Sequence, residues 1–227
     1  MSSTVEIART FGSLLIGALF ASFLSGGVTI QTLVYYKLYP TDGSSIKTLV
    51  FAIWLLDTCH TGLIWGSQWE YFIGFYGMDE KIDYIPTTLA LSIAITGILT
   101  VLVHAFFAHR IFLLSKRKWS LVVPVVIIAV LRLVSSTATT ATMLHYRSFV
   151  QFRQHVRWLF TLGLALSSAV DVLITSSLFF LLRSSKREGG SLDGVIDALI
   201  LYTFETGSVT CAATIISMIC VRISPII

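Results

Sequence analysis

The sequence predicts an all-α polytopic transmembrane helix bundle with six spans. The chain has 227 residues, of which 55% are apolar and only 12% are charged. A soluble globular domain has about 25% charged residues, and a chain of this size has too little interior to hide so much apolar surface from water. Disorder is excluded as well, because disordered chains are poor in apolar residues and rich in charge. We therefore expect an integral membrane protein.

Six apolar stretches are long enough to cross a bilayer as helices. The hydrocarbon core is about 30 Å thick and requires about 20 apolar residues in helical form. Barrel strands are about 10 residues long and alternate apolar with polar residues, whereas these stretches are longer and more continuous. Only short tails and loops remain, so residues 1–227 are expected to form a single integral membrane domain. The predicted spans are residues 11–36, 46–69, 86–114, 119–144, 157–182 and 194–221.

Small and hydroxyl residues recur at helical spacing within most of the predicted spans. The first span follows a short segment with Glu6 and Arg9 and is too long for a cleaved signal peptide, so it is expected to be a helix. Stripes of small residues allow helices to pack closely in lipid, and some could instead line a polar cavity. The stripes lie at residues 18–26, 88–104, 135–142, 163–175 and 203–217.

Basic residues predict the orientation in the membrane. The N-terminal tail, the 70–85 loop, the 145–156 loop and the C-terminal tail lie on one side, with six Lys and Arg residues counting the helix ends. The other side has nine. Because cytoplasmic loops carry the excess of basic residues, the N-terminus is expected outside.

Ionisable residues near the middle of the spans form the candidate site. A charge in mid-membrane is costly and usually faces the bundle interior or a water-filled cavity. At about 1.5 Å per residue, the four charged residues of this set lie within roughly 5 Å of one plane. The candidate intramembrane polar site consists of Asp57, His60, His104, Arg132, Asp171 and Glu205.

Three acids in this set accompany one arginine, which leaves two interpretations open. Burial and like charges disfavour ionised carboxylates, so at least one acid is expected to be protonated, paired with histidine or bound to a cation. In the functional interpretation the set is an ion, proton or ligand site. In the structural interpretation Arg132 pairs with one acid and Ser or Thr hydroxyls satisfy the others.

A basic loop is expected on the cytoplasmic side between the third and fourth spans. Contact with anionic lipid headgroups and control of topology explain such a loop, and docking of a cytoplasmic partner is the alternative. Its residues are Arg110, Lys116, Arg117 and Lys118.

Motifs of familiar enzymes and cofactor sites are absent from the sequence. It contains no H-E-x-x-H zinc motif, no G-x-S-x-G nucleophile elbow and no glycine-rich phosphate loop. A retinal Schiff base requires a mid-span lysine, and every lysine lies in a loop or at a span end. We therefore expect no enzyme activity, no catalytic residue, no cofactor, no metal and no nucleic-acid partner.

Four segments resemble a fungal, mainly basidiomycete, family of seven-helix integral membrane proteins whose domain has no known function. They are WLLDT-x-HT at 54–61, RI-x-x-LSKR-x-W at 110–119, DVLITSSL at 171–178 and LYT-x-x-TG-x-x-T at 201–210. The resemblance implies the fold and the membrane location, and no mechanism.

Two features depart from the family pattern. The family continues into a seventh helix, whereas this chain ends at Ile227 and is expected to lack that helix, which makes a homo-oligomer conceivable. The family also commonly has an amide where this chain has Glu205.

Three function classes remain open from the sequence. The first is a receptor-like or signalling membrane protein, which short loops and an outward N-terminus suit, although topology alone is an analogy. The second is a small-molecule or proton-coupled transporter that uses the midplane acids. The third is a structural membrane protein.

Overall fold

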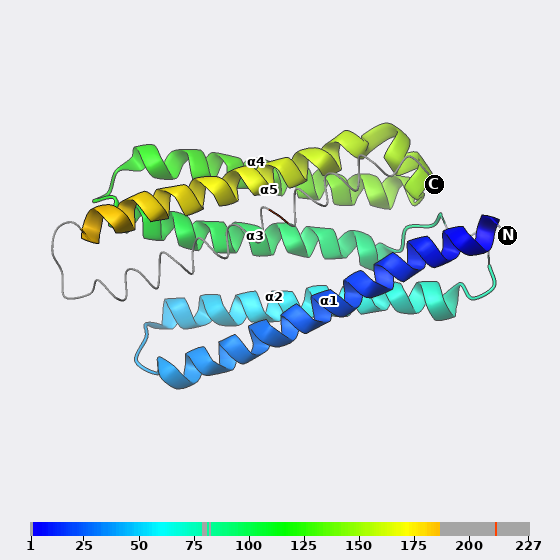
Figure 1. The fold of residues 1–227 in the computed structure, drawn as a ribbon, viewed down its shortest axis with the longest axis horizontal. Helices are drawn as coiled ribbons and strands as arrows, with labels where there is room; N and C mark the ends of the chain where they lie inside the picture. Colours follow the sequence, from blue (N-terminus) through cyan, green and yellow to red (C-terminus); the bar gives the residue numbers. More distant parts are fainter. Residues whose placement is uncertain (1, 79–80, 82, 187–211, 213–227) are drawn as a thin grey trace. The chain divides into compact units, whose positions relative to one another are not determined.

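The computed structural model describes residues 2–78, 81, 83–186 and 212. These residues form long helices and no named strand, which confirms the predicted all-α class for this part of the chain (Figure 1). The helices are α1 (Ser2–Leu38), α2 (Ser44–Trp69), the π-helical turn η1 (Glu70–Gly74), α3 (Thr87–Leu114), α4 (Trp119–Tyr146) and α5 (Phe149–Lys186).

Five of the described helical segments are long and apolar enough to cross a membrane, and they correspond to the first five predicted spans. In most cases the ends of these segments lie within a few residues of the predicted span ends. Large apolar side chains such as Phe23 and Phe180 are exposed along them, as expected for side chains that face lipid. The sixth predicted span, 194–221, lies outside the described residues. The five segments are Gly12–Leu38, Ser44–Gly74, Thr87–Leu114, Trp119–Tyr146 and Trp158–Arg183.

The described residues divide into two compact units. The first comprises residues 2–102 and 136–157, and the second comprises residues 103–135, 158–186 and 212. Helices α3, α4 and α5 each contribute one part to each unit. The single membrane domain expected from the sequence stays a prediction.

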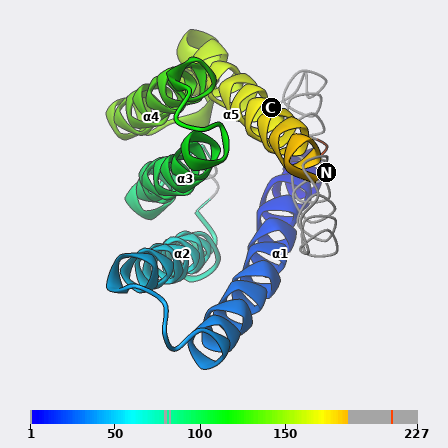
Figure 2. The same ribbon diagram turned by 90° about the vertical axis from the view of Figure 1, so that its left-hand side faces the viewer.

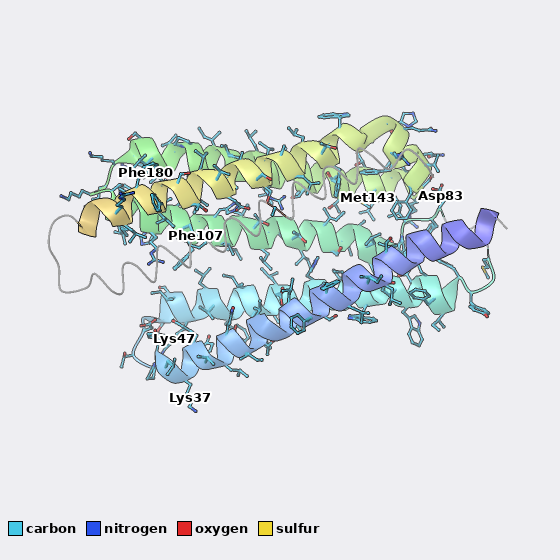
Figure 3. All side chains as sticks on the ribbon, in the orientation of Figure 1. Lys37, Lys47, Asp83, Phe107, Met143 and Phe180 are labelled. Carbon is cyan, nitrogen blue, oxygen red and sulfur yellow. The ribbon has the colours of Figure 1, made fainter. Side chains whose placement is uncertain are left out.

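In the first unit, α1 and α2 run antiparallel (Figure 1), and a short turn joins them (Figure 2). Side chains fix this turn: the Tyr35 hydroxyl donates to Asp42 Oδ2 (2.9 Å), and Lys47 Nζ donates to the Pro40 carbonyl (2.6 Å). Lys37 and Lys47 lie at the same end of the pair (Figure 3). Two basic residues at this end agree with a position at the membrane surface.

Three hydrogen bonds between side chains connect α1 to α2 along their length. Trp65 Nε1 donates to Ser22 Oγ (2.7 Å) and Trp54 Nε1 donates to Thr29 Oγ1 (3.2 Å). Between them, Ser25 Oγ donates to Asp57 Oδ2 (2.6 Å). Because lipid tails are as apolar as the side chains, helices in a membrane are held by close packing and by hydrogen bonds of this kind.

The connection between α4 and α5 is shorter than the sequence predicts. Residues 145–156 were expected to form a loop, whereas α4 ends at Tyr146 and α5 begins at Phe149. Ser148 caps the new helix, because its Oγ accepts a hydrogen bond from the Gln151 N–H (3.2 Å). Ser148 and Gln151 have the S-x-x-Q spacing of a capping box. The expected loop over residues 145–156 was wrong, because most of these residues are helical.

A distant acid strengthens the same helix start. Asp83, from the segment between η1 and α3, accepts a hydrogen bond at Oδ1 from the Val150 N–H (2.8 Å) and one from the Ser148 hydroxyl at Oδ2. Its carbonyl accepts from the Phe149 N–H (2.9 Å). Figure 3 labels Asp83 beside this turn. A negative charge at a helix N-terminus is favourable, so α5 can begin well before its apolar stretch.

The second unit packs the later half of α3, the first half of α4 and most of α5 around an apolar core. Val170, Ile111 and Leu178 are fully buried there. Partly buried side chains such as Phe107, labelled in Figure 3, cover this core. The core residues are Ala108, Ile111, Val122, Val125, Val170, Ile174, Leu178 and Leu182.

Candidate functional site

The structure brings His104 of α3 and Asp171 of α5 into contact in the second unit. His104 Nε2 lies 3.4 Å from Asp171 Oδ1, and the two side chains are 5% and 23% exposed. Both residues belong to the predicted site. The contact is the paired arrangement of acid and histidine that the sequence analysis offered as one way to hold a carboxylate in the membrane.

Arg132 of α4 is the third predicted residue of this group. The charge of Asp171 acts on its guanidinium. Its place on α4 explains why: Ser135, one turn later on the same face, donates a hydrogen bond from Oγ to the Leu159 carbonyl of α5 (3.1 Å). The face of α4 that carries Arg132 is therefore the face that packs against α5. We refer to His104, Arg132 and Asp171 as the charged cluster.

Two buried atoms of the charged cluster lack hydrogen-bond partners. Nδ1 of His104 and Nε of Arg132 are both enclosed, and neither has a partner among the described residues. Buried polar atoms in proteins are nearly always hydrogen-bonded, and exceptions call for an explanation such as a water, an ion or a ligand. The charged cluster is thus an incomplete polar network.

The surroundings of the charged cluster differ on its two sides within this unit. Toward the turn between α3 and α4, the three helices pack through the apolar core described above. In the other direction along the helices lie the buried hydroxyls of Ser135 and Ser167. Gly163 allows α4 and α5 to approach here, since an added Cβ would lie 3.1 Å from Ser135 Oγ. The cluster is therefore sealed by apolar side chains on one side and lined by small polar residues on the other.

Asp57 and His60 belong to the first unit and have other contacts there. Asp57 accepts the hydrogen bond from Ser25. His60 Nδ1 lies 3.1 Å from the Ser92 carbonyl and 3.3 Å from Thr96 Oγ1. The contact of Asp57 with a serine hydroxyl is the kind that the structural interpretation expects for an acid. Glu205, the sixth predicted site residue, lies outside the described residues.

The basic loop forms a tight turn with unusual backbone geometry. Lys116 and Arg117 have φ of 54° and 66°, in the left-handed region that non-glycine residues rarely adopt. The Lys118 N–H donates to Ser115 Oγ (3.2 Å) and closes the turn. Arg110 lies earlier, within α3. The expected contact of these residues with lipid headgroups or with a partner stays a prediction.

One polar group near the end of α2 was missed by the sequence analysis. Gln68 is 4% exposed, and its Oε1 has no hydrogen-bond partner within the part of the chain that the structure describes. Two residues later, at the start of the π-helical turn, Glu70 Oε1 accepts a hydrogen bond from Thr88 Oγ1 of α3 (3.1 Å). A glutamine and a glutamate at the end of an apolar span were the available signal.

Comparison with known proteins gives one match. Residues 167–226 match the model of a family described as "Family of unknown function (DUF6534)". The match includes Asp171 of the charged cluster and covers less than half of the chain. No curated protein and no solved structure matches the chain. The chain thus carries helices suited to a membrane, and its C-terminal part is similar to a family of unknown function.

Proposed function

We propose that the protein is a receptor-like integral membrane protein that binds a small polar solute at the charged cluster of His104, Arg132 and Asp171. One observation carries the proposal: Nδ1 of His104 and Nε of Arg132 are buried and lack partners in the described chain, while Nε2 of His104 contacts the Asp171 carboxylate. A bound solute would complete this network. The role is binding rather than catalysis.

The surroundings of the charged cluster differ on its two sides, and this difference favours a receptor over a transporter. The apolar core lies toward the turn between α3 and α4, which the basic residues predict to be cytoplasmic. The small polar residues lie toward the opposite, outer side. A site that is sealed by apolar side chains on the cytoplasmic side and lined by small polar residues on the outer side suits a receptor. An N-terminus on the outside and six spans, in the arrangement of the fungal family without its seventh helix, belong to the same proposal.

A proton-coupled transporter is the second candidate. The contact between His104 and Asp171 favours it, because histidine and acid pairs within spans form proton relays in pumps and carriers. Transport requires that the apolar core open, which reception does not. Uptake by sealed proteoliposomes separates the two, since only a transporter accumulates the solute inside.

Thermal stability in the presence of solutes tests the binding site. Purified protein would be heated with chloride, formate, ethylene glycol or methylammonium, which represent anions, neutral hydroxyl compounds and cations. A ligand that binds only the folded state raises the melting temperature. We expect one class to do so for the wild type and not for Arg132→Gln, while the control Asp57→Asn in the first unit behaves like the wild type.

The orientation is tested separately by an N-terminal tag. On intact cells an external protease should remove the tag. A tag that is cleaved only after the cells are permeabilised would contradict the outer position of the N-terminus. The binding proposal would be contradicted if no class of solute stabilised the wild type, or if Arg132→Gln kept the full effect.

A further inference from the structure

We infer that the charged cluster takes up one small monovalent anion together with one proton, the proton on His104 and the anion on the donor groups of His104 and Arg132. This inference rests on the proposed binding function and specifies the chemical class of its solute. It depends on the hydrogen-bonding capacity and the charge of the three side chains.

Arg132 restricts the ligand first. A guanidinium has only N–H donors and no acceptor. Its buried Nε has no acceptor among the described residues, so a group that completes the network must present an acceptor to it. An ammonium ion or a metal cation cannot do so. The remaining classes are anions and neutral molecules with an oxygen acceptor.

His104 is the group of the charged cluster that binds the proton. Its Nε2 faces a carboxylate oxygen, which accepts hydrogen bonds when ionised. Nε2 therefore carries a hydrogen, and Nδ1 is left as the second, unpartnered nitrogen. In neutral histidine Nδ1 is an acceptor, and in protonated histidine it is a donor. A proton from solution thus converts Nδ1 from an acceptor into a donor.

The charge count then links the two events. With neutral His104, the carboxylate of Asp171 and the guanidinium of Arg132 cancel, and a water or hydroxyl compound can bridge the remaining atoms. With protonated His104 the cluster carries a net charge of +1 and presents two unpaired donors. An unpaired charge buried among helices is strongly unfavourable. A monovalent anion that arrives with the proton restores neutrality and accepts from both donors.

The described groups around His104 are consistent with this linkage. Asp171 from α5 faces it directly, and Arg132 from α4 interacts with Asp171. Neighbouring core positions such as Ala108 and Val170 are closely packed, at 4% and 0% exposed. Close packing at this depth favours an anion the size of chloride or formate over a bulky one such as gluconate. No bond forms or breaks; a proton and an anion move from solution to the site.

The test measures anion affinity and proton uptake on the purified full-length protein. Sodium formate and sodium chloride would be titrated at constant ionic strength, with sodium gluconate as the balancing salt, from about pH 5 to about pH 8 across the usual histidine range. Linkage requires the apparent affinity to fall about tenfold per pH unit once the site is deprotonated. In weakly buffered solution, the protein should take up one proton per anion bound.

Variants distinguish the site from a general salt effect. Arg132→Gln should lose the stabilisation by formate and chloride, and His104→Gln should lose its pH dependence and the proton uptake. The control His60→Gln, a histidine of the first unit that contacts Ser92, should behave like the wild type. Each variant is first checked for a single symmetric peak in size-exclusion chromatography, and the wild-type proton count stands even if a variant fails to fold.

The outcomes separate this inference from the proposed function. The inference is overturned if anions bind with equal affinity at both pH limits, if binding occurs without proton uptake, or if only neutral or cationic solutes stabilise the protein. In the last case the binding site itself stands and its solute class is different. If no solute of any class stabilises the wild type, the proposed function fails as well. Stronger binding of formate than of chloride would point to carboxylates.

Discussion

Nε2 of His104 on α3 lies 3.4 Å from Oδ1 of Asp171 on α5, in a part of the chain where both helices are apolar enough to cross a membrane. Ionisable groups are rare in such segments and usually face the interior of the bundle. This contact joins two residues that are more than 60 positions apart in the sequence, and the charge of the same carboxylate acts on Arg132 of α4.

Loss of the Asp171 carboxylate should destabilise the protein more than loss of the Asp57 carboxylate. Asp171→Asn removes the carboxylate that contacts His104 Nε2 and whose charge acts on Arg132, so we expect a clear drop in the melting temperature, because an ionic group left without a partner among helices is unfavourable. Asp57→Asn is the matched control, since its described partner is a neutral hydroxyl. Thermal unfolding of the two variants in the same detergent measures the difference. Equal losses would show that Asp171 does not compensate a buried charge.

The hydrogen bond between Ser25 and Asp57 should contribute modestly to the packing of α1 against α2. A double-mutant cycle with Ser25→Ala and Asp57→Asn is expected to give a coupling free energy of about 0.6 kcal/mol, the average for such bonds in membranes. The same cycle between Ser22→Ala and Asp57→Asn serves as a control, because Ser22 is paired with Trp65. A coupling free energy near zero for Ser25 and Asp57 would contradict a stabilising hydrogen bond between them.

The lengths of the spans could be predicted from the sequence, whereas the start of α5 and the contacts between helices could not. The first five spans were predicted to within a few residues, because bilayer thickness fixes the length of an apolar helix. The start of α5 was not, because the apolar stretch begins well after Ser148, the residue that caps the helix, and because Asp83, which strengthens that cap, comes from a segment far earlier in the chain. The positions of Asp57 and Asp171 within their spans predict a similar depth in the membrane, but depth carries no information on which helix faces which. Only the contacts reveal that Asp57 meets Ser25 and Asp171 meets His104.

The N-terminal cap of α5 should be measurable by hydrogen exchange. Ser148→Ala removes the acceptor of the Gln151 N–H, and loss of such a cap costs about 1 kcal/mol. The amides of Val150 and Gln151 are expected to exchange about fivefold faster, in line with that free energy, while amides near Ile174 keep their protection. Unchanged exchange at Gln151 would contradict the capping geometry.

Close packing of α4 against α5 makes Gly163 sensitive to enlargement. Gly163→Ala would place a Cβ 3.1 Å from Ser135 Oγ, so we expect a lower melting temperature. Gly62→Ala in α2, where an added Cβ meets nothing within 4 Å, should be neutral or stabilising because alanine favours a helix over glycine.

The double variant Gly163→Ala with Ser135→Ala tests the cause of that strain. Without the hydroxyl, the atom of residue 135 that lies nearest to the new Cβ of residue 163 is the Cβ of residue 135, at 3.9 Å. This distance is an ordinary van der Waals contact. The double variant should therefore lose less stability than the sum of the two single variants. Strict additivity would mean that α4 and α5 do not approach at this point.

A small anion is expected to complete the hydrogen bonds of the charged cluster. X-ray diffraction from crystals grown with sodium bromide at low pH tests it most directly, because bromide is located by its anomalous signal. We predict an anomalous peak within hydrogen-bonding distance of His104 Nδ1 and Arg132 Nε, and its disappearance in crystals of Arg132→Gln. Density for a protein side chain bonded to both atoms, with no anomalous peak beside them, would contradict the claim.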